Sequence, residues 1–338
     1  MESPLRVRRQ ECGLTQFQLA ERAGVSRQLV AAVEAGQNAP AVDAALRLAG
    51  ALRSTVEQLF APPAQDVLRA LEGELRDGVP LRIGRVGERL VAAELPDHGT
   101  AGGGWAAGDG VLEDGGLRLF PGADIDGLVL AGCDPALGIA EAMLTGLGRS
   151  RLIVLSAPTD IALGSLAAGR LHAAAVHGPA DRLPVPPIPV TRIHLARWQV
   201  GLGLGPAHPA RTVEGVLGSG VAIVQRDRGA ASQQALERAA ARLRIGLAPG
   251  PRAAGHLDAA RLATTLGCAA VTTDAAANAF GLRFLAVEEH TVEIWLAREW
   301  AHHVAVEPFG NLIAGAAFTQ RVAVLGGYDL AGCGTIVG

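Results

Sequence analysis

The sequence has no lysine, so arginine supplies all 30 of its basic side chains. Against 33 acidic residues they leave a formal net charge of −3. Aromatic residues are also scarce, at 4% of the chain, whereas hydrophobic residues make up 49%. A disordered chain or a generally polybasic nucleic-acid coat needs an excess of charge and few hydrophobic residues, so both classes are excluded. DNA binding through a few local arginines stays open.

Long hydrophobic runs are missing as well. The most apolar stretch, 127–148, is interrupted by Asp134 and Glu141, so it does not predict a membrane span. The first residues lack the apolar segment of a secretory signal. No CxxC pair or Cys/His cluster occurs along the chain, which argues against a disulfide framework and structural zinc; the cysteines are Cys12, Cys133, Cys268 and Cys333. We therefore expect a cytoplasmic protein with free thiols, no metal site and no cofactor.

The length of 338 residues predicts two or three domains. Helical spacing of apolar residues over 1–62 predicts an all-α domain, with five short helices at about 4–12, 16–23, 26–35, 42–52 and 55–60. Residues 63–125 are predicted to hold a helical linker, with an amphipathic helix over 65–76, and then a small β connector. Residues 126–338 are predicted to form a two-lobed α/β domain.

The α/β prediction rests on short apolar strands that alternate with helices after residue 126. Such alternation is typical of a parallel sheet that is covered on both faces. A long strand is expected over 191–205, and it would help to join two lobes. Three glycines in it are interpreted as points of hinge flexibility: Gly201, Gly203 and Gly205. The segment 307–326 is expected to form one closing helix.

A helix-turn-helix pattern runs through the N-terminal segment. Thr15 can cap one helix with its side-chain oxygen, and Ser26 can cap the next. Gly24 permits the tight turn between the two helices. Capping at Ser26 leaves Arg27 and Gln28 at the exposed start of the second helix, the end that enters the major groove in this motif. A bare helical bundle is the alternative.

Residues 5–60 thereby resemble the helix-turn-helix domain of the phage repressor and Cro type, the XRE family. The resemblance implies that a homodimer binds double-stranded operator DNA at a two-fold site. Arg27 suits guanine, Gln28 suits adenine, and Ala31 suits a thymine methyl group. The residues expected at the DNA interface are Thr15, Gln16, Ser26, Arg27, Gln28, Ala31, Arg6 and Arg9.

In the α/β part, polar residues repeatedly stand where a predicted strand ends and a helix begins. Ligands of α/β sheets bind beyond the carboxyl ends of strands, where helix N-termini converge. We therefore expect a small-molecule site between two lobes. Its predicted ligand-binding residues are Cys133, Asp134, Ser156, Thr159, His177, Arg226, Arg228, Ser232, Thr273 and Asp274.

This part resembles the type 2 periplasmic-binding-protein fold, in particular the molybdate-binding-like domain that is fused to helix-turn-helix regulators. The resemblance is carried by 131–137, the Arg228-Gly229 turn and 326–329. It implies an oxyanion as effector. However, Asp274 stands where relatives often have a cation, which favours a ligand with amine or hydroxyl donors. For Asp134 and Asp274, a role as helix N-caps is the alternative.

Together these features predict a multidomain one-component transcriptional regulator. Its parts would be an all-α helix-turn-helix head, a small β connector and a two-lobed α/β type 2 periplasmic-binding-protein-like domain. A small polar effector in the cleft would control operator affinity through the arrangement of a dimer. The sequence offers no nucleophile–base pair, so no catalytic residues are expected. An enzyme built on the two-lobed fold, and a regulator whose sensor has lost its ligand, are the alternatives.

Overall fold

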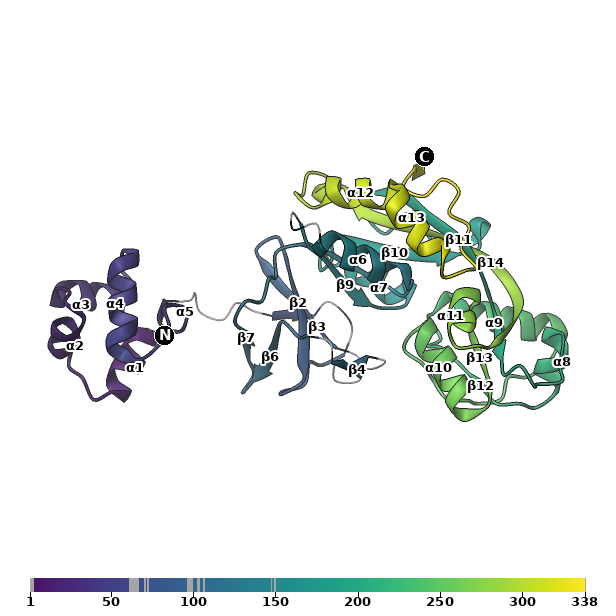
Figure 1. The fold of residues 1–338 in the computed structure, drawn as a ribbon, viewed down its shortest axis with the longest axis horizontal. Coiled ribbons are helices and arrows are strands. Elements are labelled where there is room, and N and C mark those ends of the chain that lie inside the picture. Colours follow the sequence, from purple (N-terminus) through teal and green to yellow (C-terminus); the bar gives the residue numbers. More distant parts are fainter. Residues whose placement is uncertain are drawn as a thin grey trace. The chain divides into compact units, whose positions relative to one another are not determined.

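The computed structural model describes residues 3–337 except 61–66, 70, 72, 96–99, 102–103, 106, 147 and 149. The chain divides into two compact units, Met1–Gln65 and Asp66–Gly338, and each is described by itself (Figure 1). Within the described residues, no helix is both long enough and apolar enough to cross a membrane.

The N-terminal unit is helical throughout its described part. Its helices are α1 (Pro4–Glu11), α2 (Gln16–Ala23), α3 (Arg27–Glu34), α4 (Val42–Leu52) and α5 (Val56–Phe60). Their apolar faces meet in one core that contains Leu5, Leu19 and Leu48. The helix bounds expected from the sequence agree with these bounds to within one residue at each end.

Local side-chain chemistry sets the ends of α2 and α3. At α2 the Thr15 hydroxyl accepts a hydrogen bond from Gln18 N at 3.2 Å, and Gln18 Oε1 accepts one from Thr15 N at 2.8 Å. At α3 the Ser26 hydroxyl accepts from Leu29 N at 3.1 Å. Gly24 ends α2 with a φ of 62°, which glycine adopts without strain. Both predicted caps and the tight turn are therefore confirmed.

The second unit begins with a five-stranded sheet. Its strand order is β1 (Val67–Arg69), β3 (Arg89–Glu94), β2 (Pro80–Val86), β6 (Gly110–Glu113) and β7 (Gly116–Leu119), and β4 (Thr100–Ala101) pairs separately with β5 (Gly104–Trp105). The helix expected over 65–76 is wrong where the structure describes that segment. Val67 pairs instead with Leu90 in a parallel ladder to β3. Pairing with β3 therefore overrides the helical periodicity of this segment.

The remainder of the second unit contains an eight-stranded sheet. Its order is β12 (Ile223–Val224), β13 (Ala269–Thr273), β11 (Val190–Leu204), β14 (Arg283–Ala297), β10 (Ala173–Gly178), β8 (Leu128–Gly132) and β9 (Leu152–Ser156), and β15 (Ile336–Val337) pairs with β11. As predicted, β8 is parallel to β9 and β10, and β12 is parallel to β13. The long strands β11 and β14 are antiparallel to each other.

Helices flank this sheet in two lobes (Figure 1). The first lobe combines β8, β9 and β10 with α6 (Ala136–Gly146), α7 (Thr159–Ala167), α12 (Val306–Ala314) and α13 (Ala316–Ala323). The second lobe combines β12 and β13 with α8 (Val213–Gly218), α9 (Ala231–Leu243), α10 (His256–Leu266) and α11 (Asp274–Ala279). The single closing helix expected over 307–326 is wrong, because the backbone is extended at Gly315, with a ψ of 145°.

The strands β11 and β14 run through both lobes and unite them in one continuous sheet. Two glycines in β11 serve close packing. A Cβ on Gly201 would collide with the backbone carbonyl of Leu285 in β14, and a Cβ on Gly203 would lie only 3.1 Å from Leu282. Close packing therefore requires glycine at Gly201 and Gly203, and their role in hinge flexibility stays a prediction.

Candidate functional site

The start of α3 presents polar side chains to solvent. Arg27 and Gln28 are exposed in its first turn, and Ala31 one turn later is half-buried. Arg6 is exposed on α1. Side chains at the N-terminal end of such a helix are those that reach base edges in helix-turn-helix proteins. Their contact with DNA stays a prediction, together with the contacts of the caps Thr15 and Ser26.

Arg9 was expected to contact DNA, but the structure gives it another role. It is only 8% exposed, and its Nε lies 2.6 Å from Glu34 Oε1. It also donates to the carbonyl of Leu14 at 2.7 Å. Gln16 donates to the same carboxylate, Glu34 Oε2, at 2.9 Å. Arg9 and Gln16 thus connect α1 and α2 to the end of α3. The donors of Arg9 face the protein interior instead of a phosphate, whereas Gln16 is half-buried and its contact with DNA stays a prediction.

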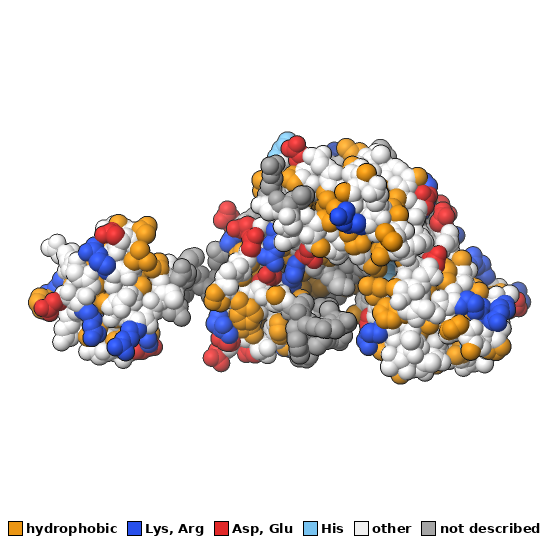
Figure 2. Space-filling view, in the orientation of Figure 1, with side chains coloured by type: hydrophobic (Ala, Val, Ile, Leu, Met, Phe, Trp, Pro, Cys, Tyr) orange, Lys and Arg blue, Asp and Glu red, His pale blue; other side chains and the backbone are white. Residues whose placement is uncertain are grey.

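Arginines on the N-terminal unit do not merge into one patch on the face shown in Figure 2. Residues 1–62 contain seven arginines and six acidic residues. A small local excess of positive charge limits nonspecific attraction to phosphates, which is the electrostatic part of DNA binding. Binding by this unit would therefore depend on the placement of a few side chains.

In the second unit, a sulfur atom and imidazole rings from both lobes meet. Cys133 follows β8 and His177 lies near the end of β10, both in the first lobe, whereas His256 begins α10 in the second. Cys133 Sγ lies 3.2 Å from His177 Nε2 and 3.7 Å from His256 Nε2. The three donor atoms are within 4.8 Å of one another, which is close enough to hold one metal ion. We call these three residues the interlobe cluster.

A chain of hydrogen bonds extends from the interlobe cluster along the strands that connect the lobes. His177 Nδ1 lies 2.9 Å from Nδ1 of His290 on β14. His290 Nε2 lies 2.8 Å from Glu288 Oε1, and Glu288 is paired with Arg238 on α9. Burial lowers the pKa of His290, so its ring is uncharged at neutral pH. Because a carboxylate only accepts, His290 Nε2 then carries the proton and its Nδ1 accepts from His177. The Nε2 atom of His177 is then an unprotonated electron-pair donor that faces Cys133.

The second lobe contributes buried polar atoms that lack a hydrogen-bond partner within the described part of the chain. Arg226 is 2% exposed and donates from Nε to the carbonyl of Ala253 at 3.0 Å. Its Nη1 atom and the hydroxyl of the fully buried Ser232 have no hydrogen-bond partner among the described residues. The same holds for His256 Nδ1 in that part of the chain. Unpartnered buried polar atoms are costly, so a group of them is typical of a site that a ligand completes.

Burial governs the protonation of this site. It raises the pKa of the Cys133 thiol, and the charge of Arg226 only partly opposes this effect. Burial also lowers the pKa of His177 and His256 well below the ordinary imidazole value, and the nearby charges on other groups lower both further. At neutral pH the cluster therefore holds a protonated thiol and uncharged imidazoles, with one positive charge on the Arg226 guanidinium.

Asp134 lies beside the interlobe cluster and is fully engaged. Its carboxylate accepts from Trp198 Nε1 at 2.8 Å, from the Tyr328 hydroxyl at 2.9 Å and from Ala136 N at 2.8 Å. Burial raises the pKa of its carboxyl group. The bond to Ala136 N, in the first turn of α6, is the capping role that the sequence left open as an alternative. Asp134 thus organises the wall of the site.

The other predicted ligand residues lie at several places. Thr159 Oγ1 is 3.4 Å from His177 N, and Thr273 caps α11 by accepting from Ala276 N at 3.3 Å. Thr273, not Asp274, is therefore the N-cap of α11. Asp274 accepts from the side chain of Asn278 within the same helix, at 2.8 Å.

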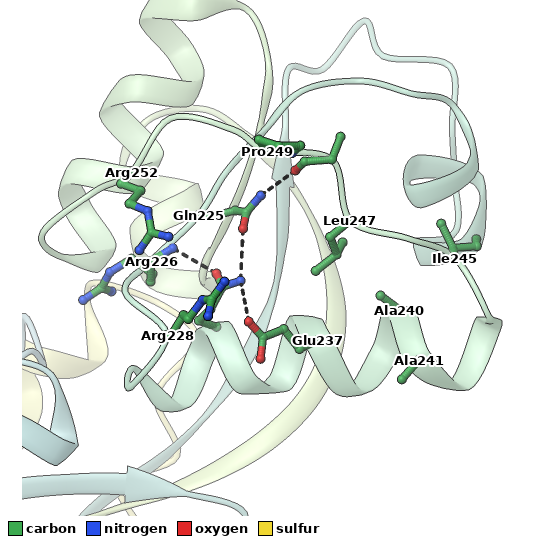
Figure 3. A pocket seen from close by; sticks show the side chains of 12 residues that line it. Gln225, Arg226, Arg228, Glu237, Ala240, Ala241, Ile245, Leu247, Pro249 and Arg252 are labelled. Atoms are coloured by element: carbon green, nitrogen blue, oxygen red, sulfur yellow. Dashed lines mark hydrogen bonds between the residues drawn. The ribbon is translucent and has the colours of Figure 1, made fainter.

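Arg228 and Ser156 line two separate cavities. Arg228 lies on a cavity of about 450 Å³ in the second lobe, which Figure 3 shows with arginines at one end and apolar side chains such as Ile245 at the other. Ser156 lines a cavity of about 300 Å³ together with Asp160 and Asp227. The structure therefore brings Cys133, His177 and Arg226 together but does not place Arg228 or Ser156 among the contacts of the cluster.

Sequence reasoning did not find His256, His290, Trp198 or Tyr328 as parts of the site. His256 comes 79 residues after His177 and on the other lobe, so no sequence spacing links the two. The sequence argued against a metal site for the same reason, whereas the structure brings together a set of residues able to ligate one. A usable signal was the position of His256 at the start of a predicted helix, where ligands of α/β folds bind.

Known proteins resemble the two units separately. Residues 5–59 match the family described as helix-turn-helix, and residues 149–314 match the PBP superfamily domain. An uncharacterized HTH-type transcriptional regulator from Methanothermobacter thermautotrophicus is 46% identical over 61 residues, which is 18% of this chain and 88% of that protein.

Solved structures that are similar to this chain have low sequence identity to it. A putative phosphate ABC transporter substrate-binding protein from Clostridium perfringens, with bound phosphate, has 9% identity and a TM-score of 0.48 over 60% of this chain and 99% of its own. The bromide-bound regulatory domain of HypT from Salmonella typhimurium has 12% identity and a TM-score of 0.45 over 59% of this chain and 95% of its own. Such identities carry neither ligand over to this chain.

Proposed function

This chain belongs to the helix-turn-helix transcriptional regulators and carries a PBP superfamily domain, and from that premise we propose that it is a one-component regulator with a ligand-controlled affinity for operator DNA. Residues 1–62 read the DNA as part of a homodimer, and residues 126–338 bind the effector. In this proposal the protein acts in the cytoplasm and catalyses no reaction.

One observation supports the sensor role above the others: the buried polar side chains that meet at the interlobe cluster come from both lobes. Arg226 and His256 belong to the second lobe and each has a buried atom without a partner among the described residues, whereas Cys133 and His177, which contact each other, belong to the first. A molecule that contacts both sets favours one orientation of the lobes over others. Such a difference in affinity between two states is what an effector needs in order to shift an equilibrium.

The positions of Arg27 and Gln28 support DNA reading by α3. Each is exposed at the capped start of the helix, and each has a side chain that forms paired hydrogen bonds with one kind of base edge. A well-formed pair of this kind discriminates by about 1–3 kcal/mol, or roughly 5–150-fold in affinity. Both residues are therefore expected to determine which operator the protein selects.

The test is a binding-site selection with the intact chain on random double-stranded DNA, followed by gel-shift titrations on the selected site. Arg27→Ala and Gln28→Ala should each lower affinity for that site by about 5–150-fold, because each removes a base contact. Arg53→Ala, which removes an exposed arginine outside α2 and α3, should change affinity far less. Equal affinity of all three variants for the selected site would overturn the assignment of α3 as the reading helix.

A further inference from the structure

We propose that Cys133, His177 and His256 bind one thiophilic metal ion, with Cu⁺ preferred to Zn²⁺. We also infer that this ion is the effector of the sensor, a step that rests on the regulator function proposed above. The first statement concerns a binding site and is testable without DNA. The second concerns its consequence and needs the DNA-binding assay.

The distances within the interlobe cluster fit a single ion. Bonds of about 2.3 Å to sulfur and about 2.05 Å to nitrogen, at tetrahedral angles, place the sulfur about 3.6 Å from each nitrogen. In the structure, Cys133 Sγ is 3.2 Å from one imidazole nitrogen and 3.7 Å from the other. All three donor atoms lie within 4.8 Å of one another. Small side-chain adjustments would therefore bring the three atoms onto one metal ion.

The hydrogen-bond chain behind His177 supports a metal more strongly than the distances alone. A metal-binding histidine usually donates its second ring N–H to another group, which fixes the ring and its tautomer. Here His177 Nδ1 is bonded to His290, and His290 is bonded to Glu288. The chain leaves a lone pair on His177 Nε2 that points at the cluster. A lone pair binds a metal ion but repels an anion, so this side of the site is unsuited to an oxyanion.

The charge of the site selects among metal ions. Binding releases the thiol proton of Cys133 to solvent and forms a sulfur–metal bond. A monovalent ion therefore takes the place of the proton, and the net charge of the site does not change. A divalent ion would add a positive charge beside the buried guanidinium of Arg226, and a low-dielectric site screens that repulsion weakly. Thiolate sulfur is a ligand of both Cu⁺ and Zn²⁺, so the charge of the site decides between the two ions. The same cluster without Arg226 would suit Zn²⁺ better.

The ion would connect the two lobes directly. Cys133 and His177 belong to the first lobe, His256 belongs to the second, and the three donors meet in the lobe orientation of this structure. Metal binding therefore stabilises this orientation relative to any in which His256 is withdrawn. A change in lobe orientation is the kind of differential contact through which a ligand controls a distant site.

The binding test uses the intact chain under anaerobic, reducing conditions, with a chromophoric Cu⁺ chelator as competitor and a Zn²⁺ chelator in parallel. We expect one equivalent of Cu⁺ per chain and a Cu⁺ affinity above that for Zn²⁺. Cys133→Ser and His256→Gln should each weaken Cu⁺ binding at least 100-fold, with circular dichroism used to verify folding. The control is Cys268→Ser, which removes a half-buried thiol elsewhere in the second lobe and should bind Cu⁺ as tightly as the unmodified chain does. Absence of stoichiometric binding, or equal binding by Cys133→Ser, would overturn the site.

A further variant tests the argument from charge. Arg226→Gln keeps a hydrogen-bond donor and removes the positive charge, so it should raise the affinity for Zn²⁺ at least tenfold more than the affinity for Cu⁺. An equal change for both ions, or tighter binding of Zn²⁺ than of Cu⁺ by the unmodified chain, would overturn the preference for a monovalent ion.

The effector step is tested by gel shift on the selected operator, with and without one equivalent of Cu⁺. Operator affinity should change at least fivefold on Cu⁺ addition, and Cys133→Ser should remove this response while it retains DNA binding. If Cu⁺ binds but operator affinity is unchanged, the ion is not the effector. If Cu⁺ does not bind while Arg27-dependent DNA binding persists, this inference fails and the proposed regulator function stands.

Discussion

The buried ion pair between Arg9 and Glu34 gives a quantitative test of how the N-terminal unit is held together. The guanidinium donates to Glu34 at 2.6 and 3.0 Å, and the side chains are only 10% and 3% exposed. Removal of one partner from a buried pair costs about 3–5 kcal/mol, because the other charge is left uncompensated. Glu34→Gln keeps the size of the side chain and removes its charge. We expect the lower end of the range, about 3 kcal/mol, because Arg9 retains some exposure.

The assay is hydrogen exchange of the intact chain, followed by mass spectrometry on peptides from α1 to α3. A loss of about 3 kcal/mol corresponds to roughly 150-fold faster exchange, since each 1.4 kcal/mol is a factor of ten. The control is Glu11→Gln, which breaks the exposed Arg8–Glu11 pair and should cost less than about 1 kcal/mol. The double variant Arg9→Met with Glu34→Leu should recover most of the protection, because it leaves no buried charge.

Two results would refute this reasoning. If Glu34→Gln accelerates exchange no more than Glu11→Gln does, the buried pair does not stabilise the unit. If the double variant is less protected than Glu34→Gln, an uncompensated charge is not the cause of the loss. Arg9→Met with Glu34→Leu also tests the DNA role first expected of Arg9: retained operator affinity in this folded variant would show that Arg9 makes no essential phosphate contact.

Two further predictions concern the second unit. Gly201→Ala should destabilise it by about 1–3 kcal/mol in thermal unfolding, because the new Cβ meets the carbonyl of Leu285. The control is Gly205→Ala, whose Cβ meets no atom within 4 Å and which should change the melting temperature little. Equal melting temperatures of the two variants would contradict the close packing at Gly201. Burial lowers the pKa of His172 from 6.5 to about 3 in the folded protein. As the pH decreases below 6.5, His172 is therefore protonated in the unfolded state while it is still uncharged in the folded state. Stability should therefore be complete above about pH 6.5 and fall by about 1.4 kcal/mol per unit as pH decreases toward 3. His172→Asn keeps an acceptor for Val129 N and should reduce this slope in urea titrations at several pH values; an unchanged slope would rule out His172 as its source.

The N-terminal unit was predictable because its signals are local. Thr15, Ser26 and Gly24 act on backbone atoms within a few residues, so their sequence positions define helix ends without knowledge of the rest of the fold. The alternation of apolar strands and helices likewise indicated the parallel parts of the large sheet. The prediction failed where the structure depends on a distant segment. The spacing of apolar residues around Val67 predicted a helix, but Val67 lies in a strand because it pairs with β3.

The candidate site could be predicted only in part, for the same physical reason. Cys133 directly follows a predicted strand, and His177 lies near the end of another. Because ligands of α/β sheets bind at the carboxyl ends of strands, the sequence indicated both residues. His256 and His290 come from other elements, and only the sheet order places them against His177. The role of Arg9 was missed because its partner, Glu34, lies 25 residues away in a helix whose packing the sequence does not specify.

The paired strands β11 and β14 have a mechanical consequence for the site. At one end of this two-stranded ribbon, β14 pairs with β10 in the first lobe; at the other end, β11 pairs with β13 in the second lobe. Trp198 and His290 are cross-strand partners between these two ends, and each bonds to a residue of the site. A change in the twist of the ribbon therefore rotates both side chains. A rotation of the lobes that twists the ribbon would therefore also move His290 behind His177 and Trp198 beside Asp134.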